Sequence, residues 1–251
     1  MKIFFALAAL ILFFAVGAAA ETTNTLSDAE IQGRKLAQQI LAQSPVANFT
    51  QTGILKIRSK TGTTTDVPVS FKTLISTESW QTSYTGGEDL LVVVHQNGHA
   101  NRYAFHRESA EEQKSKEIMS SFVTLRGGQI TSPFADSDFW ICDLGLEFFH
   151  WPAQKILPKT TNLMRGRDYT LLESTNPNPP ANGYSRVLTW MDKETGGPLQ
   201  AEAYDFNGKL LKEFAPKSFK KVNGQWQLQE MEIRNVQTGS RTRLEFDLNK
   251  Q

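Results

Sequence analysis

Cysteine is almost absent from this chain of 251 residues, because Cys142 is the only one. A single cysteine excludes an internal disulfide and a cysteine-based zinc site. Charge of one sign is also lacking: 27 basic residues, of which Lys2 lies in the leader described below, balance 26 acidic residues. A chain with this balance does not predict a nucleic-acid partner or another polyanion.

Sequence motifs of common enzymes are missing as well. There is no phosphate-binding glycine loop, no dinucleotide fingerprint and no Gly-x-Ser-x-Gly elbow. The nearest approach to the elbow is Gly183-Tyr184-Ser185-Arg186, which opens a strand-like segment and does not end one. We therefore expect no cofactor and no catalytic residues.

The amino-terminal segment has the pattern of an export signal. Lys2 precedes an apolar run from Ile3 to Val16, and Ala18 to Ala20 supply small residues before Glu21. This pattern predicts a signal peptide over residues 1–20, cleaved near Ala20/Glu21, and favours it over an uncleaved anchor. Because no cysteine follows the cleavage site to carry a lipid, we expect a soluble periplasmic protein over residues 21–251.

Two segments have helix-start signals. Ser27 to Glu30 form a capping box, and an apolar stripe follows until Ser44-Pro45, so a helix is predicted between them. A second capping box at Ser109 predicts a charged helix as far as about Ser121. Between residues 127 and 157 the pattern is least strand-like, and Asp143 is expected to cap a short helix that Pro152 ends.

The rest of the chain is patterned as strands and tight turns. From Tyr184 to Leu248, apolar and polar residues alternate between turn signals such as Asn207-Gly208 and Thr238-Gly239. Similar alternation occupies residues 49–107. We predict one mainly β (α+β) domain with a strongly curved antiparallel sheet or incomplete barrel of roughly ten to twelve strands, and two or three helices.

The order of these features resembles a known family. The matching residues are Asp138, Phe139, Asp143, Leu144, Tyr184, Val187, Trp190, Asp192, Glu194, Thr195, Gly196, Glu202, Tyr204, Asp205, Gly208, Lys209, Lys221, Asn223, Gly224, Trp226, Met231, Thr238, Gly239, Thr242, Leu244 and Phe246. Together with the leader and the capped helix, they resemble the outer-membrane lipoprotein-sorting proteins, the LolA-like group. The resemblance covers nearly the whole mature chain.

The resemblance implies that the two or three helices form a lid on the curved sheet, with an apolar cavity between sheet and lid. Proteins of this group carry the acyl chains of lipoproteins across the periplasm, from an inner-membrane exporter to an outer-membrane acceptor. It thus implies a monomeric carrier of lipoprotein or lipid acyl chains, not an enzyme. Two alternatives stay open: a module that binds other hydrophobic compounds for an inner-membrane exporter, and a lipid ester hydrolase using Ser185 or Cys142.

Aromatic residues and methionine form adaptable apolar walls, so they are the candidates for contact with acyl chains. Ordinary core packing is the competing explanation for each of them. The ten candidates are Phe139, Trp140, Phe148, Phe149, Trp151, Trp190, Met231, Ile233, Leu244 and Phe246.

Histidines and acids offer weaker signals. His95 and His99 flank the Asn97-Gly98 turn, with His106 and His150 elsewhere, and this spacing is more typical of a polar hairpin tip than of a metal site. A cluster of acids, Asp136, Asp138, Asp143 and Glu147, invites comparison with paired catalytic carboxylates. Helix capping and loop polarity account for them, so we expect no metal site and no acid-base chemistry.

Overall fold

The computed structural model describes residues 26–108, 122–222 and 224–248. The predicted signal peptide, the predicted helix from Ser109 and the turn residue Asn223 lie outside these residues. Among the described residues, no helix is long and apolar enough to cross a bilayer.

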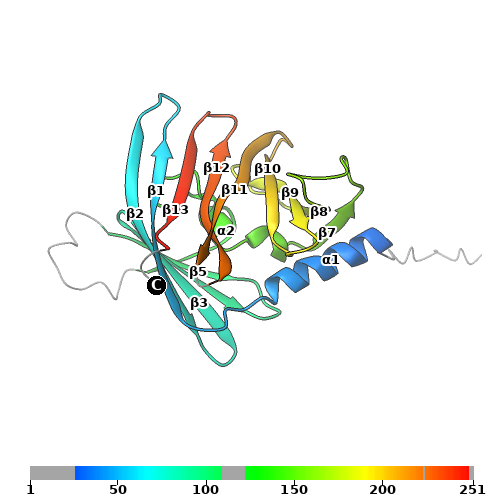
Figure 1. Cartoon of the computed structure of the whole chain (residues 1–251), viewed down its shortest axis with the longest axis horizontal. Coiled ribbons are helices and arrows are strands. Elements are labelled where there is room, and N and C mark those ends of the chain that lie inside the picture. Colours follow the sequence, from blue (N-terminus) through cyan, green and yellow to red (C-terminus); the bar gives the residue numbers. More distant parts are fainter. Residues whose placement is uncertain (1–25, 109–121, 223, 249–251) are drawn as a thin grey trace, which may run out of the picture.

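All named strands belong to one thirteen-stranded antiparallel sheet with the order β6-β5-β4-β3-β2-β1-β13-β12-β11-β10-β9-β8-β7. The two edge strands, β6 and β7, do not pair with one another, and the sheet curves strongly without closing (Figure 1). The predicted incomplete barrel is therefore confirmed. The strands are β1 Phe49–Arg58, β2 Thr64–Ile75, β3 Ser79–Gly86, β4 Asp89–Gln96, β5 Arg102–Arg107, β6 Val123–Leu125, β7 Ala153–Leu157, β8 Tyr169–Thr175, β9 Tyr184–Asp192, β10 Pro198–Asp205, β11 Leu210–Val222, β12 Gln225–Asn235 and β13 Arg241–Phe246.

The predicted first helix is α1, Asp28–Leu41, and it begins with the expected capping box. The Glu30 carboxylate accepts from the Ser27 backbone N–H at 2.8 Å, and the Ser27 hydroxyl oxygen accepts from the Glu30 N–H. The helix packs along the edge strand β7. Gly33 makes the close approach possible, because a Cβ there would lie 2.5 Å from the backbone nitrogen of Lys155.

The segment between β6 and β7 packs against one face of the sheet, called the inner face below. It holds the short helices η3 (Gly127–Thr131), α2 (Ile141–Leu144) and η4 (Glu147–His150). Its buried side chains share one core cluster with inner-face residues from most of the strands. The chain itself thus fills the middle of the curved sheet.

A second apolar cluster lies on the opposite face of β8 and β9. It is formed by Tyr169, Leu171 and Trp190, with Met164 from the β7–β8 connection packed against it. Leu171 pairs with Trp190 in register, whereas the next pair, Leu172 and Thr189, belongs to the inner face. Successive side chains alternate between the two faces, so the two clusters are separated by the sheet.

Candidate functional site

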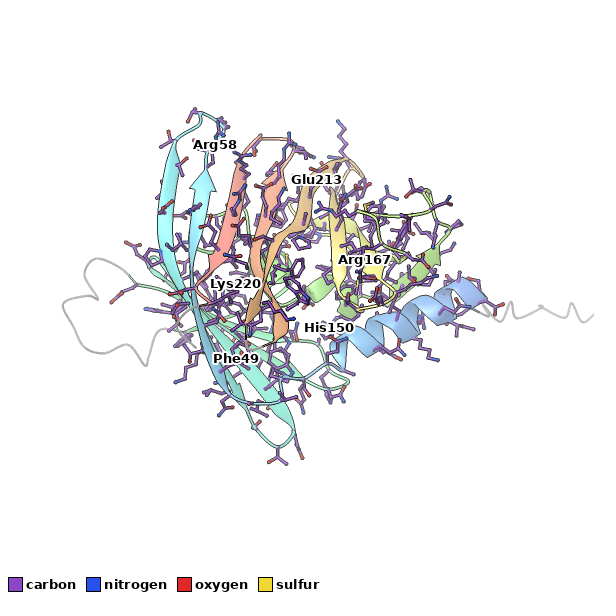
Figure 2. All side chains as sticks on the ribbon, in the orientation of Figure 1. Phe49, Arg58, His150, Arg167, Glu213 and Lys220 are labelled. Atoms are coloured by element: carbon purple, nitrogen blue, oxygen red, sulfur yellow. The ribbon has the colours of Figure 1, made fainter. Side chains whose placement is uncertain are left out.

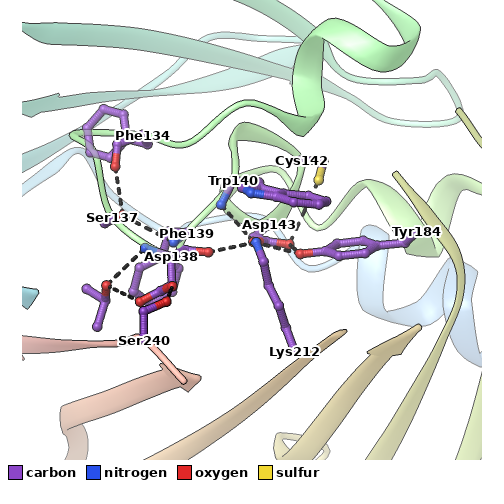
Figure 3. Close-up of polar contacts among 11 residues, drawn as sticks. Phe134, Ser137, Asp138, Phe139, Trp140, Cys142, Asp143, Tyr184, Lys212 and Ser240 are labelled. Atoms are coloured by element: carbon purple, nitrogen blue, oxygen red, sulfur yellow. Dashed lines mark hydrogen bonds and ion pairs between the residues drawn. The ribbon is translucent and has the colours of Figure 1, made fainter. Parts of the chain in front are cut away.

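A buried ionic network holds the inner segment on the sheet (Figure 3). The Lys212 ammonium, on β11, lies 3.4 Å from the Asp143 carboxylate and donates to the Asp138 backbone carbonyl at 2.7 Å. It also lies 3.6 Å from the centre of the Trp140 ring. Burial lowers the pKa of Lys212 and raises that of Asp143, while their attraction opposes both shifts.

Asp143 has a larger role than the predicted helix cap. It is the third residue of α2, and its carboxylate accepts from the Trp140 backbone N–H at 2.8 Å. The Tyr184 hydroxyl on β9 also donates to it, at 3.0 Å. The same carboxylate therefore starts the short helix and ties it to β9 and β11.

Asp138 adds a third tie, to β13. Its carboxylate accepts from the hydroxyls of Ser240, at 2.5 Å, and Thr242, at 2.9 Å. Its own backbone N–H donates to the Thr242 hydroxyl oxygen. Each acidic group in this network thus has partners that are positioned to hold the segment in place.

An open cleft of about 990 Å³ lies beside α1, at the end of the inner segment. Its walls are the carboxyl-terminal half of α1, the β2–β3 turn, the β4–β5 hairpin and residues 149–154. The apolar part of the lining includes Leu41, Ile75, Trp80, Phe149 and Trp151. A cleft of this size is at the upper end of the range for pockets that enclose small molecules, about 300–1,000 Å³.

One wall of the cleft carries polar atoms without partners. The Nε2 atoms of His95 and His150 and the Oδ1 atom of Asn101 are buried and make no hydrogen bond with the described residues. Trp80 stacks on His95 with the ring centres 3.7 Å apart. Burial lowers the pKa of His95 to about 4, with Asn101 opposing and His150 adding to the shift.

Burial also lowers the pKa of His150, which is labelled in Figure 2. Burial thus favours the neutral form of both imidazoles. The cleft has few charged residues, Arg34 on α1 and Glu78 in the β2–β3 turn, so it can accept an uncharged apolar molecule without desolvating many ions.

The structure distributes the ten predicted contact residues over several places. Phe149 and Trp151 line the cleft. Phe139, Phe148, Ile233 and Leu244 are buried in the inner core, and Trp140, Met231 and Phe246 pack against it partly exposed.

Phe246 and Trp190 each have a further setting of their own. Phe246 also borders a separate hollow of about 600 Å³ formed with β1, β2 and β3. Trp190 lies in the cluster on the opposite face, so its position does not support a role in an inner cavity.

Sequence reasoning missed Trp80, His95 and the end of α1 as cleft residues. Trp80 on β3 pairs directly with His95 on β4. The end of this hairpin therefore forms part of the cleft wall. The two histidines near the Asn97-Gly98 turn were the available signal. His95 and His99 both line the cleft, whereas His106, farther along β5, does not.

The described residues contain no group of three or more His, Cys, Asp or Glu side chains placed to hold a metal ion. The two nucleophiles of the hydrolase alternative are poorly placed. Burial raises the pKa of the Cys142 thiol well above its usual range. The Ser185 hydroxyl donates to the Asp205 backbone carbonyl at 2.5 Å.

Solved structures share this fold at low sequence identity. A DUF1329 family protein from Desulfovibrio piger ATCC 29098 has a TM-score of 0.68 at 18% identity, over 88% of this chain and 92% of that chain. A domain described as an outer membrane lipoprotein-sorting protein from Vibrio parahaemolyticus has a TM-score of 0.67 at 19% identity, over 88% and 95%. A LolA superfamily protein from Nitrosomonas europaea has a TM-score of 0.58 at 15% identity, over 88% and 92%.

No curated protein matches the chain significantly in sequence. A family model described as "-like: Uncharacterized protein" matches residues 118–250, which is more than half of the chain. The chain therefore belongs to that family, and its fold is that of the LolA-like lipoprotein-sorting proteins.

Proposed function

We propose that the chain is a periplasmic carrier that shields the acyl chains of lipoproteins or other lipids during transfer toward the outer membrane. In this proposal residues 1–20 are removed and residues 21–251 act as one LolA-like domain and a monomer. The observation that carries the proposal is the cleft of about 990 Å³ beside α1, with its apolar and aromatic lining.

An acyl chain exposed to water has a large unfavourable free energy, which is why it needs a carrier. Burying a CH₂ group contributes about 0.8 kcal/mol, so a chain of about sixteen carbons is disfavoured in water by on the order of 12 kcal/mol. A carrier in the periplasm must remove this surface from water and later release it. The cleft provides such a surface without a covalent step.

Release requires a second state of the cleft. One wall is α1, which packs on the edge strand β7 and on η4. An acceptor that binds the open form better than the closed form shifts the population toward release. In this proposal an inner-membrane exporter loads the carrier and an outer-membrane acceptor unloads it.

The test is native mass spectrometry with lipid extraction on the protein purified from a periplasmic fraction. The proposal predicts a mature chain starting near Glu21, with copurified acyl species close to one per chain. If the extracted compounds carry no acyl chain, the exporter-accessory alternative gains support. A protein that is empty, and stays empty when offered acylated peptide, contradicts the carrier.

A matched pair of tryptophan variants locates the cargo. Trp80→Ala removes part of the cleft wall and should weaken binding of a fluorescent fatty acid about tenfold. Trp226→Ala removes a tryptophan that is 71% exposed on β12 and does not line the cleft, so it should leave that affinity unchanged. Equal effects of the two variants would place the cargo elsewhere.

A further inference from the structure

The hairpin of β11 and β12, orange in Figure 1, is longer than its neighbours in the sheet. β10 pairs with β11 only between Leu210 and Phe214, and β13 pairs with β12 only between Glu230 and Arg234. Beyond these points the two strands continue to pair with each other as far as Val222 and Gln225. Residues 217–222 and 224–229, called the hairpin arm below, are thus outside the pairing of the other strands.

One face of the hairpin arm presents aromatic side chains to solvent. Trp226 is 71% exposed and Phe219 is 54% exposed. Phe219 pairs with Leu228, and Lys221 pairs with Trp226, so these four side chains share one face of the ribbon. Adjacent exposed apolar side chains on one face, unlike single scattered ones, indicate an interaction site.

The charge of the hairpin arm differs from that of the whole chain. Residues 217–229 include Lys217, Lys220 and Lys221 and no acidic residue. Lys217 forms an ion pair with Glu232 at 2.8 Å at the base of the arm, whereas Lys221 is exposed beside Trp226. The arm is therefore locally cationic in a chain whose charges otherwise balance.

We propose that the hairpin arm docks the protein on the surface of a bilayer that contains anionic phospholipid. Tryptophan is favoured at the interface between lipid and water, and nearby lysines are attracted to anionic headgroups. A second copy fits less well, because two-fold packing of this face would set Lys221 of one chain near the same cationic arm of the other. The inference concerns the membrane surface and does not depend on the cargo.

The experiment measures binding of the full mature chain to vesicles by sedimentation. The probes are vesicles of phosphatidylethanolamine with phosphatidylglycerol, compared with vesicles of phosphatidylcholine alone. The proposal predicts stronger partitioning to the anionic vesicles, weakened by salt, with a shift of tryptophan emission to shorter wavelength on binding.

Variants assign this binding to the hairpin arm. Trp226→Ala should weaken partitioning about tenfold, and Lys221→Gln should weaken it less and reduce its salt dependence. Phe206→Ala is the matched control, because Phe206 is 51% exposed in a turn outside the arm. It should change nothing.

Equal binding to both kinds of vesicle would overturn the proposal, and so would unchanged vesicle binding of Trp226→Ala. If Trp226→Ala instead dissociates a dimer and keeps vesicle binding, the arm is an interface between two copies and the proposal is likewise overturned. The carrier proposal is tested separately. Trp80→Ala should lose cargo and keep vesicle binding, while Trp226→Ala should do the reverse.

Discussion

The inner face of the sheet has two regions, one covered by the inner segment and one left open as a cleft. In the middle, residues 127–148 fill the curved face and are fastened by Lys212, Asp143 and Tyr184. Beside α1, the same face is left as a cleft of about 990 Å³. A curved sheet therefore does not by itself create a cavity, because the position of the inner segment decides where space remains.

The largest expected effect concerns the filled region. Lys212→Ala leaves the buried Asp143 carboxylate without its cation, and we expect the free energy of unfolding to fall by about 3–5 kcal/mol. Urea denaturation measures the change. Lys212→Met with Asp143→Asn should recover part of the loss, because both charges are then removed and the amide oxygen can still accept hydrogen bonds.

Lys217→Ala is the matched control for this prediction. Its ion pair with Glu232 is at 2.8 Å, but the Lys217 side chain is 37% exposed. We expect a loss of at most about 1 kcal/mol. Similar losses for Lys212→Ala and Lys217→Ala would show that the buried network does not hold the inner segment.

The next prediction concerns the wall between the two regions. In Gly33→Ala the new Cβ would lie 2.5 Å from the Lys155 nitrogen and 2.6 Å from the Gln154 carbonyl carbon, so α1 must move away from β7. We expect a loss of roughly 1–3 kcal/mol and weaker acyl binding. Denaturation and fluorescent fatty acid binding measure both, with Gln32→Ala, on an exposed helix position, as control.

The smallest expected effect concerns the polar wall of the cleft. Burial lowers the pKa of His95 to about 4 from 6.5, so between these values the unfolded chain binds a proton that the folded chain does not. This histidine therefore contributes to a loss of stability as pH falls from about 6.5 to 4. Between pH 6.5 and about 4, His95→Phe should therefore lose less stability than the unchanged protein. The difference between the two losses should be about 2 kcal/mol or less, because the ring is partly exposed.

His99→Phe is the control, since His99 is exposed on the same hairpin. Denaturation at several pH values compares each variant with the unchanged protein. An identical pH dependence for His95→Phe and the unchanged protein would mean that His95 is not buried as the structure places it.

Local signals in the sequence predicted much of the fold. The Ser27 capping box set the start of α1, and Gly208 and Gly239 adopt positive φ in the predicted turns. Alternation in the carboxy-terminal strands predicted the sheet, and the curved, unclosed form is confirmed. These features are determined by residues that are close together in the sequence, which is why they could be predicted from it.

The location of the cleft depends on contacts that are distant in sequence. The alternation of apolar and polar residues places Leu171 on one face of its strand. It does not show which face the inner segment covers. Trp190 consequently lies in the opposite cluster, and Asp143 reaches Lys212 across 69 positions of sequence. Trp80 becomes a cleft residue only when α1 packs beside the hairpins, which neither segment reveals alone.

The central claim is that an acyl chain lies in the cleft beside α1 and not in the filled middle of the sheet. Photo-crosslinking with a fatty acid that carries a diazirine along its chain, followed by peptide mapping, tests it most directly. The account predicts saturable adducts within residues 34–44, 75–80, 95–101 and 149–154, which form the cleft. Adducts concentrated at Met231, Ile233 and Leu244, or no saturable adduct, would contradict it.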